Sequence, residues 1–178
     1  MRLDSYTARG FDRGASLWRQ VIWYAANRLL LQSWLPGSRW RKILLVIFGA
    51  EVGKGVVIKP GVRVKFPWRL KVGDYTWVGE DVWVDNLAEV VIGSHVCISQ
   101  GAYLCTGSHN WSAEAFDLIT KGIIIEDHAW VGARASLAPG ASMAVGAVLS
   151  MSSLGCGEIS SWTIYAGTPA VAQRARHH

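Results

Sequence analysis

The sequence predicts an all-β fold, a parallel β-helix of hexapeptide repeats that follows an N-terminal α-helical segment. Aliphatic residues recur every six positions between Val72 and Leu154, and this period fits neither an α-helix nor a two-faced strand. Glycine often follows the aliphatic residue, and the fourth residue after it is small or β-branched. Three such hexads close one coil, in which the aliphatic side chains stack inward. The aliphatic positions are Val72, Val78, Val84, Ile92, Ile98, Leu104, Ile125, Val131, Leu137, Met143 and Leu149, and the small positions are Thr76, Val82, Val96, Ala102, Ala129, Ala135, Ala141 and Ala147.

The composition fits one globular domain. The chain has 178 residues, of which 51% are hydrophobic, so it can bury a full core and is not a disordered chain. Its three cysteines are odd in number and form no CxxC pair, which argues against a disulfide framework and favours a reducing, cytoplasmic setting. Residues 1–14 are polar and charged, so we expect no secretory signal.

Positive charge is concentrated in the first part of the chain. The net charge is +5, but residues 1–71 hold fourteen Lys or Arg against three Asp or Glu, a balance of +11. Residues 72–178 hold four against ten, a balance of −6. This asymmetry predicts an anionic partner, such as a phospholipid leaflet or a phosphate-bearing substrate. Nucleic acid is not expected, because the sequence holds no nucleic-acid-binding module.

The chain is expected to begin with an extended arm at residues 1–15 and a helix at residues 16–35. The helix begins at a Ser16 cap and stops before Pro36. Arginine and amide residues interrupt its apolar run, and arginine is costly at the centre of a bilayer, so we do not expect a membrane span.

Two interpretations of this helix remain open. It packs on the β-helix or on a neighbouring subunit, or it is an interfacial anchor with its tryptophans at headgroup depth. In the second case residues 16–42 make peripheral membrane contact, and three basic residues lie near lipid phosphate: Arg39, Arg41 and Lys42.

We divide the chain into three parts. Residues 1–50 form the arm and helices, including a second short helix at 39–48 that caps the first coil, because repeat folds need a cap at an open end. Residues 51–160 form the β-helix, with two register slips and a loop at 106–122. Residues 161–178 form a C-terminal segment. Long insertions at one corner of such scaffolds carry function, so the loop is the expected site.

His109 is the main candidate for chemistry in this loop. An imidazole can accept a proton at neutral pH, and a hydroxyl needs such a base before it can act as a nucleophile. A lone loop histidine is more often a bystander, so its assignment depends on the surrounding scaffold.

Several segments carry a family resemblance: Arg63–Trp68, Val72–Gly79, Val84–Leu87, Cys97–Trp111 and the Gly167–Ala170 ending. They resemble the hexapeptide-repeat O-acetyltransferases, a group that includes the galactoside and maltose acetyltransferases. The greater similarity is to the colanic acid (exopolysaccharide) biosynthesis acetyltransferases. The resemblance covers nearly the whole chain, and Tyr103–Trp111 is its most specific part.

This resemblance implies a left-handed β-helix, a homotrimer, and acetyl-CoA bound in a groove between subunits. It gives the role of general base to His109. Asp85 aligns with an asparagine that contacts the acceptor in the acetyltransferases, so a carboxylate replaces an amide there and could bind a sugar hydroxyl or orient His109. We also expect Asn110 and Trp111 to contact the acceptor.

The resemblance also implies a set of acetyl-CoA contacts along the C-terminal coils. Small residues would let the pantetheine arm lie against the prism wall, and a basic residue would pair with a phosphate. The stretch Ser150–Gly157 departs from the family pattern and lacks its lysine, and Arg134 could compensate. The matching positions are Ala133, Met151, Cys156, Gly157 and Arg174.

We therefore expect an acetyl-CoA-dependent O-acetyltransferase of exopolysaccharide biosynthesis. Its acceptor is a saccharide, free or lipid-linked, and its place is the cytoplasm or the inner leaflet of the plasma membrane. One alternative is a catalytically decayed scaffold or regulatory protein at the membrane, which would not bind CoA. The other is a metal-dependent hydratase. No metal is expected, because such sites need three histidines with two close in sequence, and His95 and His128 form no such set.

Overall fold

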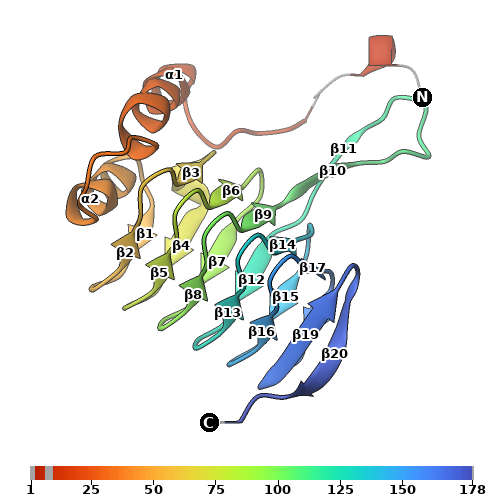
Figure 1. Cartoon of the computed structure of the whole chain (residues 1–178). Coiled ribbons are helices and arrows are strands. Elements are labelled where there is room, and N and C mark those ends of the chain that lie inside the picture. The colour runs from red at the N-terminus through yellow and green to blue at the C-terminus, as the bar shows by residue number, and fades with distance from the viewer. Residues whose placement is uncertain (1–2, 7–9, 178) are drawn as a thin grey trace.

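In the computed structural model, which describes residues 3–6 and 10–177, the chain forms a β-helix with two helices at its first coil (Figure 1). Each of the first five coils contributes one strand to each of three walls, and the stacked strands of these coils are parallel, as in the pairing of Val72 with Ile92. The predicted fold class is confirmed. Residues 1–2, 7–9 and 178, which fall in the predicted arm and C-terminal segment, lie outside the described residues.

The three walls are called sheets A, B and C in the order in which the chain visits them. Sheet A contains β1 (Glu51–Val52), β4 (Leu70–Val72), β7 (Val90–Ile92), β12 (Ile123–Ile125), β15 (Ser142–Met143) and β18 (Glu158–Ile159). Sheet B contains β2 (Val57–Ile58), β5 (Trp77–Val78), β8 (Cys97–Ile98), β13 (Trp130–Val131), β16 (Val148–Leu149), β19 (Thr163–Gly167) and β20 (Ala170–Ala175). Sheet C contains β3 (Arg63–Val64), β6 (Trp83–Asp85), β9 (Tyr103–Cys105), β14 (Ser136–Leu137) and β17 (Leu154–Gly155).

The core is built from the two hexad positions that the sequence singled out. All eleven aliphatic positions are at most 7% exposed, and all eight small positions are at most 1% exposed. The small residues face inward beside the corners, where little space remains. Gly132 shows why glycine follows the aliphatic residue: a Cβ there would lie 2.6 Å from the Met151 backbone nitrogen of the next coil.

The insertions into the repeat all occur at one corner, between sheets C and A. The two register slips fall between β3 and β4, where the 3₁₀ turn η3 (Pro67–Arg69) lies, and between β6 and β7. The long loop falls between β9 and β12, at the same corner of the next coil. In repeat folds, insertions that share a face commonly build the binding site.

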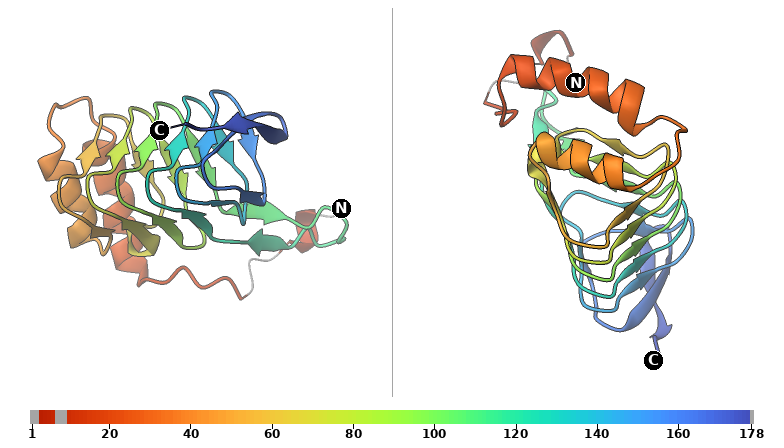
Figure 2. Two further views of the ribbon diagram at one scale, coloured as in Figure 1. Left: turned by 90° about the horizontal axis from the view of Figure 1, so that it is seen from below. Right: turned by 90° about the vertical axis from the view of Figure 1, so that its left-hand side faces the viewer.

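The N-terminal helices close the first coil. After a short 3₁₀ turn, η1 (Leu3–Ser5), the chain forms α1 (Leu17–Ala26), a π-helical turn η2 (Asn27–Leu31) and α2 (Arg39–Ile47). Figure 2 shows α2 across the opening of the first coil with α1 beside it. The indole N–H of Trp23 donates to the carbonyl oxygens of Val64 and Lys65, each at 3.0 Å. The helix therefore packs on the β-helix, as the first of the two interpretations requires.

The prediction of one helix over residues 16–35 was too long. Its start is correct, because the Ser16 hydroxyl accepts from the Arg19 backbone nitrogen at 3.4 Å. The α-helix ends at Ala26, where the Asn27 side chain turns inward to donate to the Val64 carbonyl at 3.1 Å.

The placement of Arg41 near lipid phosphate was also wrong. Its side chain is fully buried and donates to four backbone carbonyls, at distances from 2.6 to 3.2 Å. Burial lowers the pKa of the guanidinium from its usual value, but arginine still stays charged at neutral pH. Arg41 therefore stabilises the turn between the two helices. The carbonyl groups that accept its hydrogen bonds belong to Leu31, Ser33, Leu35 and Gly37.

The β19–β20 hairpin covers the last coil, with Thr163 opposite Ala175. Within residues 3–6 and 10–177, no helix has both the length and the apolar character that crossing a membrane requires.

Candidate active site

His109 lies on an antiparallel hairpin that leaves the prism at the corner between sheets C and A. The hairpin consists of β10 (Gly107–His109) and β11 (Leu118–Thr120), and His109 pairs with Leu118. The loop predicted at 106–122 is thus a pair of strands rather than an irregular segment. Figure 1 shows the hairpin extending past the coils, with η1 near its tip.

The imidazole of His109 is held in one orientation. Its Nδ1 lies 2.8 Å from the carbonyl oxygen of Phe116, and because a carbonyl only accepts, the neutral ring carries its proton on Nδ1. Nε2 then holds the lone pair. The Phe116 ring stacks on the imidazole at 4.2 Å between centroids, and the Tyr6 ring contacts its edge at 5.5 Å. The geometry therefore leaves Nε2 as the proton acceptor.

His109 lines a cavity of about 730 Å³ that lies between the hairpin, the N-terminal arm, α1 and the first coils. This volume suits a small-molecule site. Its wall is rich in aromatic rings, which pack well against the flat faces of sugar rings. The aromatic side chains that line it are Tyr6, Phe11, Trp23, Tyr24, Phe66, Trp68 and Trp83.

The cavity is positively charged. Arg13, Arg63 and Lys65 line it, and no carboxylate occurs among the described residues of its wall. The Arg63 guanidinium lies 4.6 Å from the Trp83 ring, which in turn packs 4.7 Å from Tyr103. These residues hold equivalent positions on β3, β6 and β9, so the register of sheet C brings them together.

Asp85 forms a polar cluster at the side of this cavity. Its carboxylate pairs with the Lys65 ammonium at 2.9 Å and accepts from the Tyr103 hydroxyl at 3.1 Å. Burial, followed by hydrogen bonding and the charges of its neighbours, raises the pKa of Tyr103 well above its usual value, so the hydroxyl stays a donor. Asp85 thus pairs with Lys65 and Tyr103, and the contact that orients His109 comes from the Phe116 carbonyl.

Asn110 and Trp111, the two other residues expected to contact the acceptor substrate, lie at the hairpin turn. Asn110 accepts from the Ser112 backbone nitrogen at 3.1 Å and so shapes the turn. Trp111 is 80% exposed. Neither side chain is among those that line the cavity with His109.

The expected acetyl-CoA residues are spread over three places. Ala133 and Met151 lie together at the corner between sheets B and C, where the Ser152 backbone nitrogen donates to the Ala133 carbonyl at 2.9 Å. Cys156 and Gly157 lie at the opposite end of sheet C, at the corner from which the hairpin emerges. Arg174 lies on β20, paired with Ile164. The first four residues thus lie beside the ends of the strands of sheet C, whereas Arg174 lies on sheet B.

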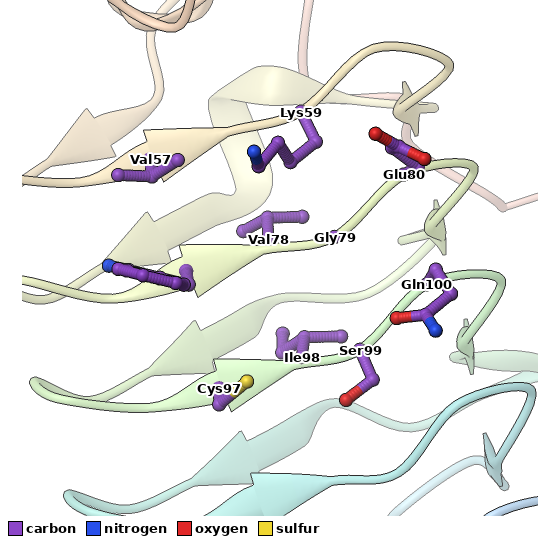
Figure 3. Close-up of a pocket in the computed structure, with 10 residues that line it drawn as sticks. Val57, Lys59, Val78, Gly79, Glu80, Cys97, Ile98, Ser99 and Gln100 are labelled. Atoms are coloured by element: carbon purple, nitrogen blue, oxygen red, sulfur yellow. The ribbon is translucent and has the colours of Figure 1, made fainter.

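A second hollow, of about 370 Å³, lies on the outer face of sheet B (Figure 3). It contains Lys59, Glu80 and Cys97 but not His109, so we do not take it as the reaction site. His95 and His128 stack at 5.2 Å on a different corner. No cluster of three or more His, Cys, Asp or Glu that could hold a metal occurs in the part of the chain that the structure describes.

Roles for Lys65, Trp83 and Phe116 were not predicted from the sequence. The first two could have been found from the coil length, because Arg63, Trp83 and Tyr103 are spaced by twenty residues, and so are Lys65, Asp85 and Cys105. The contribution of α1 to the cavity had no local signal.

No family model matches the chain. A protein of Escherichia coli (strain K12) that bears the name colanic acid biosynthesis acetyltransferase WcaF is 38% identical over 170 residues, which cover 94% of this chain and 92% of the relative. A hexapeptide-repeat-containing acetyltransferase from Vibrio cholerae O1 biovar eltor, complexed with acetyl coenzyme A, superposes with a TM-score of 0.84 at 22% identity, over 98% of this chain and 97% of that chain. A galactoside acetyltransferase in complex with coenzyme A gives 0.79 at 17% identity, over 98% and 91%.

The two solved structures share the fold with this chain. The relative from Escherichia coli is similar over nearly its full length, and it matches the resemblance first seen in the segments around His109. The chain therefore belongs to the hexapeptide-repeat acetyltransferases, in the family of WcaF.

Proposed function

We propose that the protein transfers an acetyl group from acetyl-CoA to a hydroxyl of a saccharide in exopolysaccharide biosynthesis. The observation that carries this proposal is His109, held by the Phe116 carbonyl with Nε2 as proton acceptor in an aromatic, cationic cavity. Acetyl-CoA supplies the acyl group as a thioester. His109 Nε2 takes the hydroxyl proton as the oxygen bonds to the acetyl carbon, and the sulfur leaves to give free CoA.

The cavity supports a saccharide acceptor that carries negative charge near the reacting sugar. Aromatic rings such as Tyr24 offer stacking faces, and Arg13, Arg63 and Lys65 offer charge-assisted hydrogen bonds. A sugar linked to lipid through phosphate has this chemistry. Leu17, Val21 and Tyr24 of α1 continue the wall toward an apolar surface, which suits such a lipid.

Lys65→Met tests the contact with an anionic acceptor. We expect the acceptor KM to rise about tenfold while kcat changes little, because Lys65 binds the acceptor in the ground state and the transition state alike. Lys54→Met is the matched control, because this exposed lysine also pairs with a carboxylate, that of Asp74 at 3.8 Å, but does not line the cavity. Steady-state kinetics with a saccharide acceptor that the wild type acetylates measure KM and kcat for both variants. Equal acceptor KM values in the two variants would remove the anionic contact from the proposal.

The acetyl-CoA site is proposed along sheet C. Ala133 and Met151 lie at the corner between sheets B and C, and Cys156 and Gly157 lie at the corner between sheets C and A, where the hairpin arises. The two solved acetyltransferases above contain acetyl coenzyme A and coenzyme A, which supports a similar ligand here. Arg174 would pair with a CoA phosphate from β20.

The functional unit is proposed to be a homotrimer with each site between two subunits. Trp77 and Trp130 support subunit contact on the outer face of sheet B, where they are 58% and 46% exposed on strands in register through Cys97. The three-part division into residues 1–50, 51–160 and 161–178 is part of the same proposal. The three free cysteines favour the cytoplasm as the compartment.

Acetyl transfer is tested by incubating the full chain with acetyl-CoA and a panel of free, phosphorylated and lipid-linked sugars. Free thiol release and the acetylated product are both measured. We expect thiol release that depends on the acceptor, with one acetyl ester formed for each thiol. If CoA does not bind and no acceptor is acetylated, the chain is instead a scaffold that has lost catalysis, and the proposed function is wrong.

A further inference from the structure

The outer surface of the helical cap is apolar and unpartnered. Twelve large hydrophobic side chains between Leu17 and Ile47 are 46% or more exposed. They include Trp18, which is 76% exposed, and Trp34, which is 82% exposed, and exposure of large indole rings to water is unfavourable. A monomeric protein rarely exposes so many apolar groups in adjoining elements unless they contact something.

This apolar surface results from how the helices pack. Along α1 and the start of η2, the stripe that faces the protein consists of Arg19, Trp23, Ala26 and Asn27. The opposite stripe, at helical spacing from Trp18 through Ile22 to Leu29, is apolar and exposed. On α2, Ile43, Val46 and Ile47 are likewise apolar and exposed. They lie on one face of the helix with the exposed Arg39, at spacings of four, three and one residues.

The charges around this surface have one sign. No Asp or Glu occurs between Asp12 and Glu51, while this stretch contains six Arg or Lys. Arg28 and Arg39 are exposed on the two helices. If two copies joined through this surface, cation would face cation with no carboxylate in the patch to pair with it. An anionic phospholipid surface complements both the apolar side chains and the charge.

We propose that the exposed face of α1, η2 and α2 docks on an anionic phospholipid bilayer. Trp18 and Trp34 lie at the depth of the headgroups, the aliphatic stripes enter the acyl boundary, and Arg28 and Arg39 contact lipid phosphates. The same helix lines the His109 cavity with Leu17 and Val21, so docking brings the cavity mouth to the membrane surface. Attachment goes beyond acetyl transfer, and vesicle binding is measured without acetyl-CoA or acceptor, so each proposal can fail alone.

The test is co-flotation of the full-length protein with vesicles of phosphatidylcholine alone or of phosphatidylcholine with phosphatidylglycerol. We expect binding to the anionic vesicles that weakens as salt is added. The triple variant Trp18→Ser, Ile22→Ser, Val46→Ser should bind at least about tenfold more weakly, because three apolar side chains no longer enter the bilayer. The matched variant Trp111→Ser, Ile119→Ser, Val171→Ser removes the same residue types from exposed positions elsewhere, and it should bind like the wild type.

Three results would overturn the proposal. The wild type stays unbound with both vesicle types, or the cap variant binds as tightly as the wild type. The third result is that light scattering shows a smaller oligomer for the triple variant with Trp18→Ser than for the wild type. A second copy of the chain would then cover this surface. Circular dichroism of both triple variants confirms that each is folded before vesicle binding is compared.

Discussion

His109→Ala is expected to reduce the rate of acetyl transfer by about a hundredfold to ten-thousandfold, the range that a missing general base costs. The hydroxyl of a sugar is a weak nucleophile while protonated, and Nε2 of His109 is the acceptor that the Phe116 carbonyl leaves available. The loss should fall on kcat, because proton transfer occurs in the transition state and not in the bound ground state. Thiol release with the best saccharide acceptor measures it.

A second histidine provides the control for this substitution. His95 is exposed and stacks between Tyr75 and His128, so His95→Ala removes an imidazole without touching the cavity and should retain wild-type turnover. Calorimetry with CoA shows whether the donor site of His109→Ala is intact. If His109→Ala binds CoA and turns over at the rate of His95→Ala, another group is the base and the proposed mechanism is wrong.

The β-helix could be predicted from the sequence because its energetics repeat along the chain. Every coil buries an aliphatic residue and a small residue at the same two places, as Val131 and Ala135 do in one coil, so the period of six appears directly in the sequence. Glycine after the aliphatic residue has the same origin, since the coils approach each other closely at Gly132.

The cavity could be predicted only in part. The histidine on an insertion was visible, but the opposite wall comes from α1 and the N-terminal arm, whose positions depend on distant contacts such as that of Trp23 with Val64. The sequence also did not show which charged side chains are exposed and which are buried. Arg28 is exposed and Arg41 is fully buried, although both are arginines in predicted helices with apolar neighbours. A sequence pattern shows which side chains are charged, but it does not show which backbone carbonyls are left without partners.

Arg41→Met is expected to destabilise the helical cap by about 2–4 kcal/mol, because it removes hydrogen bonds from a charged donor and leaves buried carbonyls unpaired. Methionine fills similar space, so the cavity effect is small and the loss reflects the missing donors. The carbonyls concerned belong to the turn between α1 and α2. Hydrogen exchange should show loss of protection in residues 17–47, while the coils of the β-helix keep theirs.

Arg39→Met separates this effect from the loss of a positive charge. Arg39 lies on the same helix, two residues earlier, and is exposed, so its replacement should change stability by no more than about 0.5 kcal/mol. If both variants show the same midpoint of thermal unfolding and the same exchange in residues 17–47, the carbonyl contacts of Arg41 contribute nothing. If only Arg41→Met loosens the cap, it should also lose vesicle binding, because the two apolar stripes then no longer lie on one rigid surface.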